Sequence, residues 1–335
     1  MNTVLLAAMH FLVDFICAWA MYGFFRQGSG GYENLLIYNF CAFALQMPLG
    51  TLLDLLDRRK RHRYVSLFWA VAGAALTAVG ALVHPVVLGI GNALFHVGGG
   101  MEVIEDDFAR NLKGRDLGVF VAPGAIGLYL GAISGNKLVV LIFCSVVLVV
   151  LTVALFWNKG RKTYQQTQVQ EKTIGKIWLL AVCCFAVVIL RSYVGLSADF
   201  PWKSGAVFGL LAVLSVVLGK MAGGILGAKF GSGKTACISL LLASACFAAG
   251  ENPVFGLLAL LLFNMSMPVT LYMLARALPN LPGFSFGLLT FGLFLGFLPV
   301  YGGLDLHMTG ALGSIFSAVL LMIGEKAVRK EHVSY

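Results

Sequence analysis

The stretch VVLGIGNALFHVGGGMEVIEDD, residues 86–107, begins as an apolar run and carries His96 near its middle. Three glycines follow at 98–100, then Glu102 and three further acids at 105–107. In a soluble protein this pattern would indicate a buried helix with one histidine. In a membrane span, a charged side chain near the bilayer midplane costs about 2.5–3.5 kcal/mol on insertion. Such residues are therefore retained only where another group pairs with them or where they have a function.

Composition places the whole chain in a membrane. Of its 335 residues, 59% are hydrophobic and 12% are charged, and the mean hydropathy is +0.88. Soluble domains are about 45–50% apolar and about 25% charged. The seven cysteines lie in apolar runs without metal-ligand spacing, so we expect no disulfide framework, no metal and no cofactor. The net charge of +9 comes from short loops and does not indicate nucleic-acid binding.

The apolar runs predict an all-α membrane protein with twelve transmembrane helices, since a spanning helix needs about 20 apolar residues. Their continuous apolar character excludes a barrel, in which alternate residues would be polar. We place the helices at about 3–25, 33–56, 64–82, 86–106, 117–134, 138–157, 175–197, 204–227, 235–250, 253–275, 284–302 and 309–327.

Basic residues predict the orientation of these spans. With the loop 57–63 in the cytoplasm, nineteen lysines and arginines fall on the cytoplasmic side. Only Arg26, Lys137 and Lys203 fall on the other side. This asymmetry supports the number of spans and places both termini in the cytoplasm.

One long polar segment divides the chain into near-equal halves, as expected for two parallel repeats. We expect an N-terminal six-helix bundle at 1–157, a cytoplasmic linker at 158–174, a C-terminal six-helix bundle at 175–327 and a cytoplasmic tail at 328–335. The loops on the outer side are very short, so we expect no extracellular domain.

Two six-span halves resemble the major facilitator superfamily, and four local motifs add to this resemblance. Gly91–His96 is similar to the fourth-span signature of the fosmidomycin-resistance branch. Arg191-Ser192 in the seventh span and Met267–Thr270 in the tenth resemble further elements of that branch. Gly50–Asp54, followed by Arg58-Arg59, resembles the loop 2/3 signature of the whole superfamily. The four motifs occur in the order that this family shows.

The chain departs from these patterns at several positions. Val97 stands where the branch has proline, and Leu55 and Asp57 replace an arginine and a glycine after Asp54. In the second half, Ala228 replaces the aspartate of the corresponding loop, so we expect the second charge relay at the gate to be absent or weaker. The resemblance therefore implies a fold and alternating access, but not a substrate.

Two ionisable residues of the first span share one helix face, because His10 and Asp14 are four residues apart. At about 1.5 Å per residue, Asp14 and His96 both come near the bilayer midplane. In the superfamily, spans one and four line the central cavity. We expect His10, Asp14 and His96 to form a protonatable cluster that exchanges protons with substrate. The alternative is a structural Asp–His hydrogen bond between the two spans.

Two further ionisable residues lie within predicted spans. Arg191 lies about two-thirds of the way along the seventh span, where its guanidinium would suit a carboxylate or phosphonate. Pairing with Asp199 is the alternative. Glu102, further along the fourth span, is either a proton-path residue or a partner for Arg110 or Arg115.

The resemblance and the glycine spacing suggest roles for two more groups. As the superfamily motif implies, Asp54 with Gly50, Arg58 and Arg59 would latch the cytoplasmic gate. The fifth span carries small residues at helical spacing, which let two helices approach closely. These residues are Gly124, Gly127, Gly131 and Gly135. Exporters of the superfamily often have a glycine-rich fifth span, but tight packing alone explains the spacing equally well.

Together these features predict a secondary active transporter that performs proton-coupled efflux (antiport) of a small polar or anionic compound by alternating access. Its partners would be a small-molecule substrate, protons and the lipid bilayer. We expect a monomer in a bacterial plasma (inner) membrane. Proton-coupled uptake is the alternative within transport. An intramembrane enzyme would need a nucleophile–base pair or a metal motif, which the sequence lacks, and a non-transporting scaffold would need larger loops.

Overall fold

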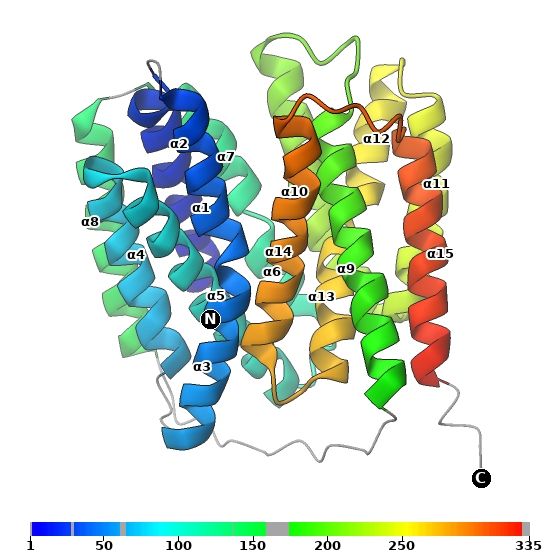
Figure 1. Cartoon of the computed structure of the whole chain (residues 1–335), viewed down its shortest axis with the longest axis horizontal. Coiled ribbons are helices and arrows are strands. Elements are labelled where there is room, and N and C mark those ends of the chain that lie inside the picture. The colour runs from blue at the N-terminus through cyan, green and yellow to red at the C-terminus, as the bar shows by residue number, and fades with distance from the viewer. Residues whose placement is uncertain (1, 28–29, 61–64, 136, 159–173, 330–335) are drawn as a thin grey trace. The chain divides into compact units, whose positions relative to one another are not determined.

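The computed structural model describes residues 2–27, 30–60, 65–135, 137–158 and 174–329, without the side chains of residues 58–60, 174 and 329. This part of the chain is helical and contains no strand (Figure 1). Its helices are α1 (Asn2–Ala20), η1 (Met21–Phe25), α2 (Gly31–Asn39), η2 (Phe40–Ala44), α3 (Gln46–Lys60), α4 (Val65–Val83), α5 (Pro85–Ala109), α6 (Arg115–Val121), α7 (Gly124–Ile133), α8 (Leu138–Trp157), α9 (Ile174–Ser197), α10 (Gly205–Phe230), α11 (Ser232–Ala248), α12 (Pro253–Asn264), α13 (Ser266–Ala277), α14 (Pro282–Tyr301) and α15 (Gly310–Arg329).

The number of spans agrees closely with the prediction. Among the described residues, eleven helical stretches are long and apolar enough to cross a membrane. The predicted ninth span corresponds to α11, which is apolar but has only 17 residues. At 1.5 Å per residue it is about 26 Å long, a little shorter than a hydrocarbon core of about 30 Å.

Four predicted spans are built from more than one helix. The first consists of α1 and the π-helical turn η1, which together form the stretch Asn2–Phe25. The second consists of α2, the π-helical turn η2 and α3, which together form one membrane-length stretch, Gly31–Asp57. The fifth is interrupted between α6 and α7 at Pro123, which has no backbone N–H to continue the helix. The tenth is interrupted at Met265, between α12 and α13. These interruptions lie within the apolar runs, so hydropathy alone does not reveal them.

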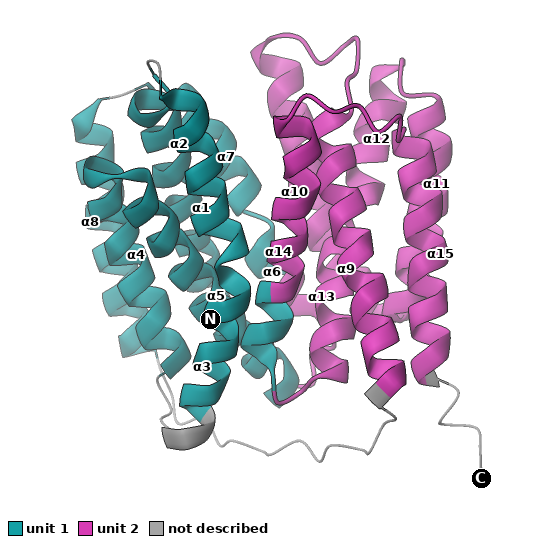
Figure 2. Ribbon diagram, in the orientation of Figure 1, with its two compact units in different colours: residues 1–109, 119–165, 281–287 teal, residues 110–118, 166–280, 288–335 magenta. Residues whose placement is uncertain are grey.

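Internal contacts divide the chain into two compact units (Figure 2). The first comprises residues 1–109, 119–165 and 281–287, and the second comprises 110–118, 166–280 and 288–335. The predicted linker at 158–174 lies almost wholly outside the described residues. The predicted bundle boundaries therefore remain a prediction.

Close packing of α4 against α5 forms the core of the first unit. A Cβ added to Gly73 of α4 would overlap the backbone of Phe95, and one added to Gly98 of α5 would meet the backbone of Ala70. The two helices can approach this closely because Gly73 and Gly98 have no side chains at the points of contact. Helix α1 packs against α7, α4, α5 and α8 in the same unit. The ionisable residues of α1 are thereby placed beside α5.

The second unit is a separate set of packed helices. Helix α9 packs against α15 and α13, and α11 packs against α15 and α12. One of its apolar clusters surrounds Phe200 and Trp202, and the indole Nε1 of Trp202 donates a hydrogen bond to the carbonyl of Gly250 at 2.8 Å. This bond satisfies the one polar atom of a buried indole.

Helix α8 presents a long row of exposed apolar side chains. Val139, Ile142, Phe143, Val146 and Val150 are each more than half exposed. Such a continuous apolar surface is suited to hydrocarbon rather than to water.

Candidate functional site

The first unit brings His10, Asp14 and His96 together. Helix α1 places His10 and Asp14 one turn apart, with His10 Nε2 3.2 Å from Asp14 Oδ2. Helix α5 places His96 opposite them, with its Nε2 3.6 Å from Asp14 Oδ1 and 2.9 Å from His10 Nε2. All three side chains are at least nine-tenths buried. The cluster that the sequence suggested is therefore a compact group of two imidazoles and one carboxylate, which we call the histidine–aspartate triad.

Neighbouring polar groups orient each member of the triad. His10 Nδ1 lies 2.7 Å from the carbonyl oxygen of Phe120, and His96 Nδ1 lies 2.9 Å from that of Asn92. The Asn92 amide donates to Asp14 Oδ1 at 3.2 Å and to the Cys17 thiol at 3.4 Å. We did not single out Asn92 as a site residue from the sequence. Asn92 lies four residues before His96 and therefore on the same face of α5, and this spacing could have indicated it as a site residue.

Glycines of α7 allow α1 to approach closely at the triad. A Cβ added to Gly124 would overlap Asp14 Oδ2 and His10 Nε2. Cβ atoms on Gly127 and Gly131 would overlap the backbone carbonyl oxygens of successive turns of α1. Gly135 differs from the other three, because it lies beyond the end of α7 with φ of +72° and a Cβ there would meet nothing within 4 Å. Gly124, Gly127 and Gly131 are therefore required by close helix packing, whereas Gly135 is required by its left-handed backbone conformation.

Arg191 lies in the second unit, on α9, and is buried with 7% exposure. Within the described residues its Nε has no hydrogen-bond partner, and no acid forms an ion pair with its guanidinium. The alternative pairing with Asp199 is therefore absent here, and Asp199 is exposed to the surroundings. A buried guanidinium without an anion is unfavourable in the ligand-free protein and suited to bind one.

Glu102 is buried on α5 and accepts a hydrogen bond from the Ser66 hydroxyl of α4 at 2.8 Å. Its predicted partners, Arg110 and Arg115, both form ion pairs with Asp116. Asp116 itself is buried and is not among the site residues that the sequence predicts. The hydrogen bond between Ser66 and Glu102 links two packed helices, α4 and α5.

Asp54 binds the first turn of α14. Its Oδ1 accepts a hydrogen bond from the backbone N–H of Gly283 at 2.9 Å, and its Oδ2 accepts from that of Phe284 at 2.8 Å. These are donors that a helix N-terminus leaves without partners, and the positive end of the helix dipole also favours a carboxylate there. Gly50, one turn earlier, touches Gly283 so closely that a Cβ would overlap its carbonyl. The side chains of Arg58 and Arg59, the other predicted gate residues, lie outside the described part of the structure.

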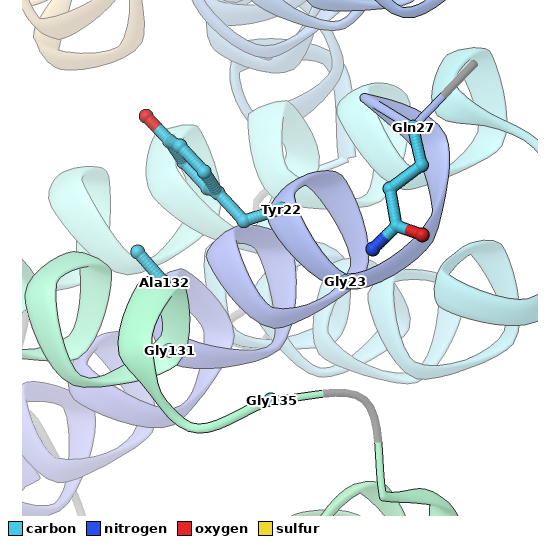
Figure 3. Close-up of a pocket in the computed structure, with 6 residues that line it drawn as sticks. All are labelled: Tyr22, Gly23, Gln27, Gly131, Ala132 and Gly135. Carbon is cyan, nitrogen blue, oxygen red and sulfur yellow. The ribbon is translucent and has the colours of Figure 1, made fainter.

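A cavity of about 200 Å³ lies at the far end of α1 and α7 (Figure 3). It is lined by Tyr22, Gly23, Gln27, Gly131, Ala132 and Gly135. It contains no member of the triad, since Gly131 is two helical turns, or about 10 Å, along α7 from Gly124. We therefore base the candidate site on the buried ionisable groups and not on this cavity.

Comparison with known proteins gives a fold and no closer relative. No family model matches the chain, and no curated protein matches its sequence. Solved structures do match over almost its whole length, and one of them is described as a major facilitator superfamily transporter. The chain therefore has the fold of that superfamily, and with its apolar helices it is an integral, multi-pass membrane protein.

One of these structures is described as the E. coli fucose:proton symporter FucP, and another as a major facilitator superfamily transporter, FucP. The first has 14% sequence identity and a TM-score of 0.59, with 98% of this chain and 96% of the other covered. The second, described as an outward conformation, has 11% identity and a TM-score of 0.59, with 98% and 99% covered. At this level of identity the likeness concerns the fold.

Proposed function

We propose that this protein is a secondary active transporter that exports a small polar or anionic compound in exchange for protons by alternating access. The observation that carries the proposal is the histidine–aspartate triad. A carboxylate and two imidazoles buried within membrane-spanning helices are expensive to maintain, and in transporters such groups mark proton and ion pathways. The fold of the superfamily supports a secondary transporter independently of the triad, without indicating the direction of transport.

The triad would act as the coupling site. Imidazole changes its charge near physiological pH, and a neighbouring carboxylate supplies the opposite charge. Asp14, His10 and His96 lie on two different helices, α1 and α5, so a change in protonation alters the attraction between these helices. A purely structural Asp–His hydrogen bond would need only one of the two imidazoles.

Arg191 would hold the anionic group of the substrate. Its planar guanidinium matches a carboxylate or a phosphonate with two parallel hydrogen bonds. The absence of an ion pair within the described residues leaves its charge available for such a ligand.

Asp54, with Gly50, would form part of the cytoplasmic gate. Asp54 accepts two hydrogen bonds from the first turn of α14, and these bonds can form and break as that end of α14 moves. Arg58 and Arg59 would complete the gate, as the superfamily signature implies. Glu102 is a further candidate for the proton path.

Export is favoured over uptake by the resemblance to the fosmidomycin-resistance branch and by the glycine-rich fifth span, which exporters of the superfamily often have. Proton-coupled uptake is the second candidate, because the similar structure FucP is described as a fucose:proton symporter. In either case we place the protein as a monomer in a bacterial inner membrane, with both termini in the cytoplasm.

Proteoliposomes containing a pH-sensitive dye would test the proposal. Substrate-dependent proton flux in the wild type, lost in Asp14→Asn and in His96→Ala at matched protein content, is the expected result. The sign of the flux distinguishes exchange from co-transport. Wild-type coupling in both variants would disprove the role of the triad, and turnover of a labelled lipid would instead indicate an enzyme. A thermal-shift screen of anionic metabolites and antibiotics would identify the substrate, as a compound that raises the melting temperature of the wild type but not that of Arg191→Ala.

A further inference from the structure

The backbone carbonyls beside the triad determine which nitrogen of each imidazole carries a hydrogen. His10 Nδ1 faces the carbonyl oxygen of Phe120 at 2.7 Å, and His96 Nδ1 faces that of Asn92 at 2.9 Å. A carbonyl oxygen can only accept a hydrogen bond, so each Nδ1 must be the donor. The other tautomer would place a bare nitrogen against a bare oxygen in a buried site. Each ring therefore has its Nδ1 protonated.

With both Nδ1 atoms protonated, a neutral imidazole has a bare Nε2. The two Nε2 atoms are 2.9 Å apart, which is hydrogen-bond distance, and the rings meet edge to face with centroids 4.5 Å apart. Two bare nitrogens at that distance repel each other, and two protonated ones would also repel. We infer that His10 and His96 share a single proton between their Nε2 atoms, and that this shared proton is the one exchanged during transport.

The carboxylate of Asp14 balances the charge of this proton. Its two oxygens lie 3.2 Å from His10 Nε2 and 3.6 Å from His96 Nε2, so the loaded triad is neutral overall. The Asn92 amide also donates to Asp14, as expected for an ionised carboxylate that accepts hydrogen bonds. Asp14 is therefore the counter-ion of the proton and not its carrier.

Few other titratable groups face the pair from the helices packed around it. Cys17, on α1, is linked to Asp14 through Asn92, and the Tyr38 hydroxyl of α2 hydrogen-bonds the Cys17 thiol. These two groups are neutral at physiological pH, since a thiol and a phenol lose their protons only at higher pH. Among the described contacts of the triad, α7 contributes Gly124, and α6 contributes the Phe120 carbonyl and ring.

The geometry favours a proton over a metal ion between the rings. The two imidazoles and the carboxylate are close enough to share a metal, with ligand atoms within 4.8 Å of one another. Two imidazole nitrogens on one tetrahedral zinc ion, each at 2.0–2.1 Å, would lie about 3.3 Å apart. The observed separation of 2.9 Å is shorter and matches a nitrogen–hydrogen–nitrogen bridge.

Release of the shared proton has a structural consequence. Without it, two bare nitrogens and a carboxylate would face one another in a buried site, so the rings must separate. Because His10 belongs to α1 and His96 to α5, the proton bridge holds these helices together at this level. The use of the bridge in transport rests on the proposed function, whereas its existence does not.

The direct test is NMR of the full-length protein in lipid nanodiscs, with ¹⁵N-labelled histidine. The expected result is two protonated Nδ1 atoms and a ¹⁵N–¹⁵N coupling across the bridge between the two Nε2 atoms. The coupling should vanish in His10→Gln and in His96→Gln, and persist in the exposed control His84→Gln. An unprotonated Nδ1 on either ring, or no coupling at any pH at which the protein is folded, would overturn the inference.

Two further experiments test the role of Asp14 as the counter-ion and the possibility of a metal ion between the rings. In Asp14→Asn, loss of the counter-ion should abolish the coupling at a pH at which the wild type shows it. A coupling that persists unchanged in Asp14→Asn would show that Asp14 is not the counter-ion. Treatment with EDTA should leave the spectrum unchanged, and a change would place a metal ion between the rings. Since these readouts do not involve transport, a bridge in a protein without proton flux would refute the proposed function alone.

Discussion

Gly124 of α7 lies directly against Asp14 of α1, so closely that any side chain at position 124 would overlap the carboxylate. The same position would also meet the imidazole of His10. A residue that neither titrates nor binds thus determines whether the triad can form. The glycine spacing of the fifth span and the ionisable face of the first span, which appear as separate sequence features, are parts of one contact.

Gly124→Ala should therefore disturb the triad. Because the contact atoms belong to a buried ion pair, the added methyl forces α1 and α7 apart, and overpacking of this kind costs about 1–3 kcal/mol. We expect a lower melting temperature and at least a ten-fold loss of substrate-dependent proton flux. Gly195→Ala on α9 is the matched control, since a Cβ there meets nothing within 4 Å. Wild-type flux in Gly124→Ala would show that the triad tolerates displacement.

Asp54→Ala should expose the first turn of α14. It removes both acceptors for the amides of Gly283 and Phe284, and loss of such a helix cap costs about 0.5–2 kcal/mol. Hydrogen exchange at these two amides should become faster, and Asp54→Asn, which keeps one acceptor, should have an intermediate effect. Asp57→Ala, one turn further along α3, serves as the control. Unchanged exchange at both amides in Asp54→Ala would remove the basis for a gate contact.

Arg191→Met should stabilise the ligand-free protein while it abolishes the binding of an anionic ligand. Methionine fills a similar volume and removes a buried charge whose Nε has no hydrogen-bond partner in the described structure. Since an unsatisfied buried polar group costs about 1–3 kcal/mol, the ligand-free variant should melt at a higher temperature than the wild type. It should also lose the thermal shift caused by an anionic ligand. Arg276→Met, at an exposed position, should change neither quantity. A destabilised Arg191→Met would imply that the guanidinium already has a structural partner.

The loop between α14 and α15 should respond to acid. The backbone N–H of His307, together with its imidazole and the Tyr193 hydroxyl, holds the pKa of the exposed Asp305 below its ordinary value of 3.8. The ionised form is thus favoured by the folded loop. Its contribution is fully present above about pH 3.8 and is lost as the pH falls through the lower folded pKa.

The Leu306 amide reports on this loop, because it donates to Tyr193 at 2.8 Å. Its hydrogen-exchange protection, corrected for intrinsic rates, should fall below pH 3.8. It should also be reduced at neutral pH in Asp305→Ala, but not in Asp199→Ala, which changes another exposed acid, between α9 and α10. Protection that stays constant through this pH range would exclude a role for the ionised carboxylate.

Much of the fold follows from sequence, because a membrane imposes a local rule. Each span must supply about 20 apolar residues in succession, so the runs can be counted directly along the chain. Interruptions such as those at Pro123 and Met265 are not visible in that count. They depend on which backbone groups neighbouring helices can satisfy.

For the site, sequence alone placed His10 and Asp14 on one face of α1, because residues four apart must share a face. It also identified His96 and Arg191 as ionisable groups within apolar spans, and Asp54 through the resemblance to the superfamily motif.

Only the tertiary structure decided what these groups touch. Three contacts join residues that are distant in the chain: His10 with the Phe120 carbonyl, Gly124 with Asp14, and Asp54 with the α14 amides that donate to it. The contact of His96 with the Asn92 carbonyl is local. Hydropathy and helical spacing specify which face of a helix is polar. They do not specify which helix lies against it, because that choice depends on the packing of every side chain between them.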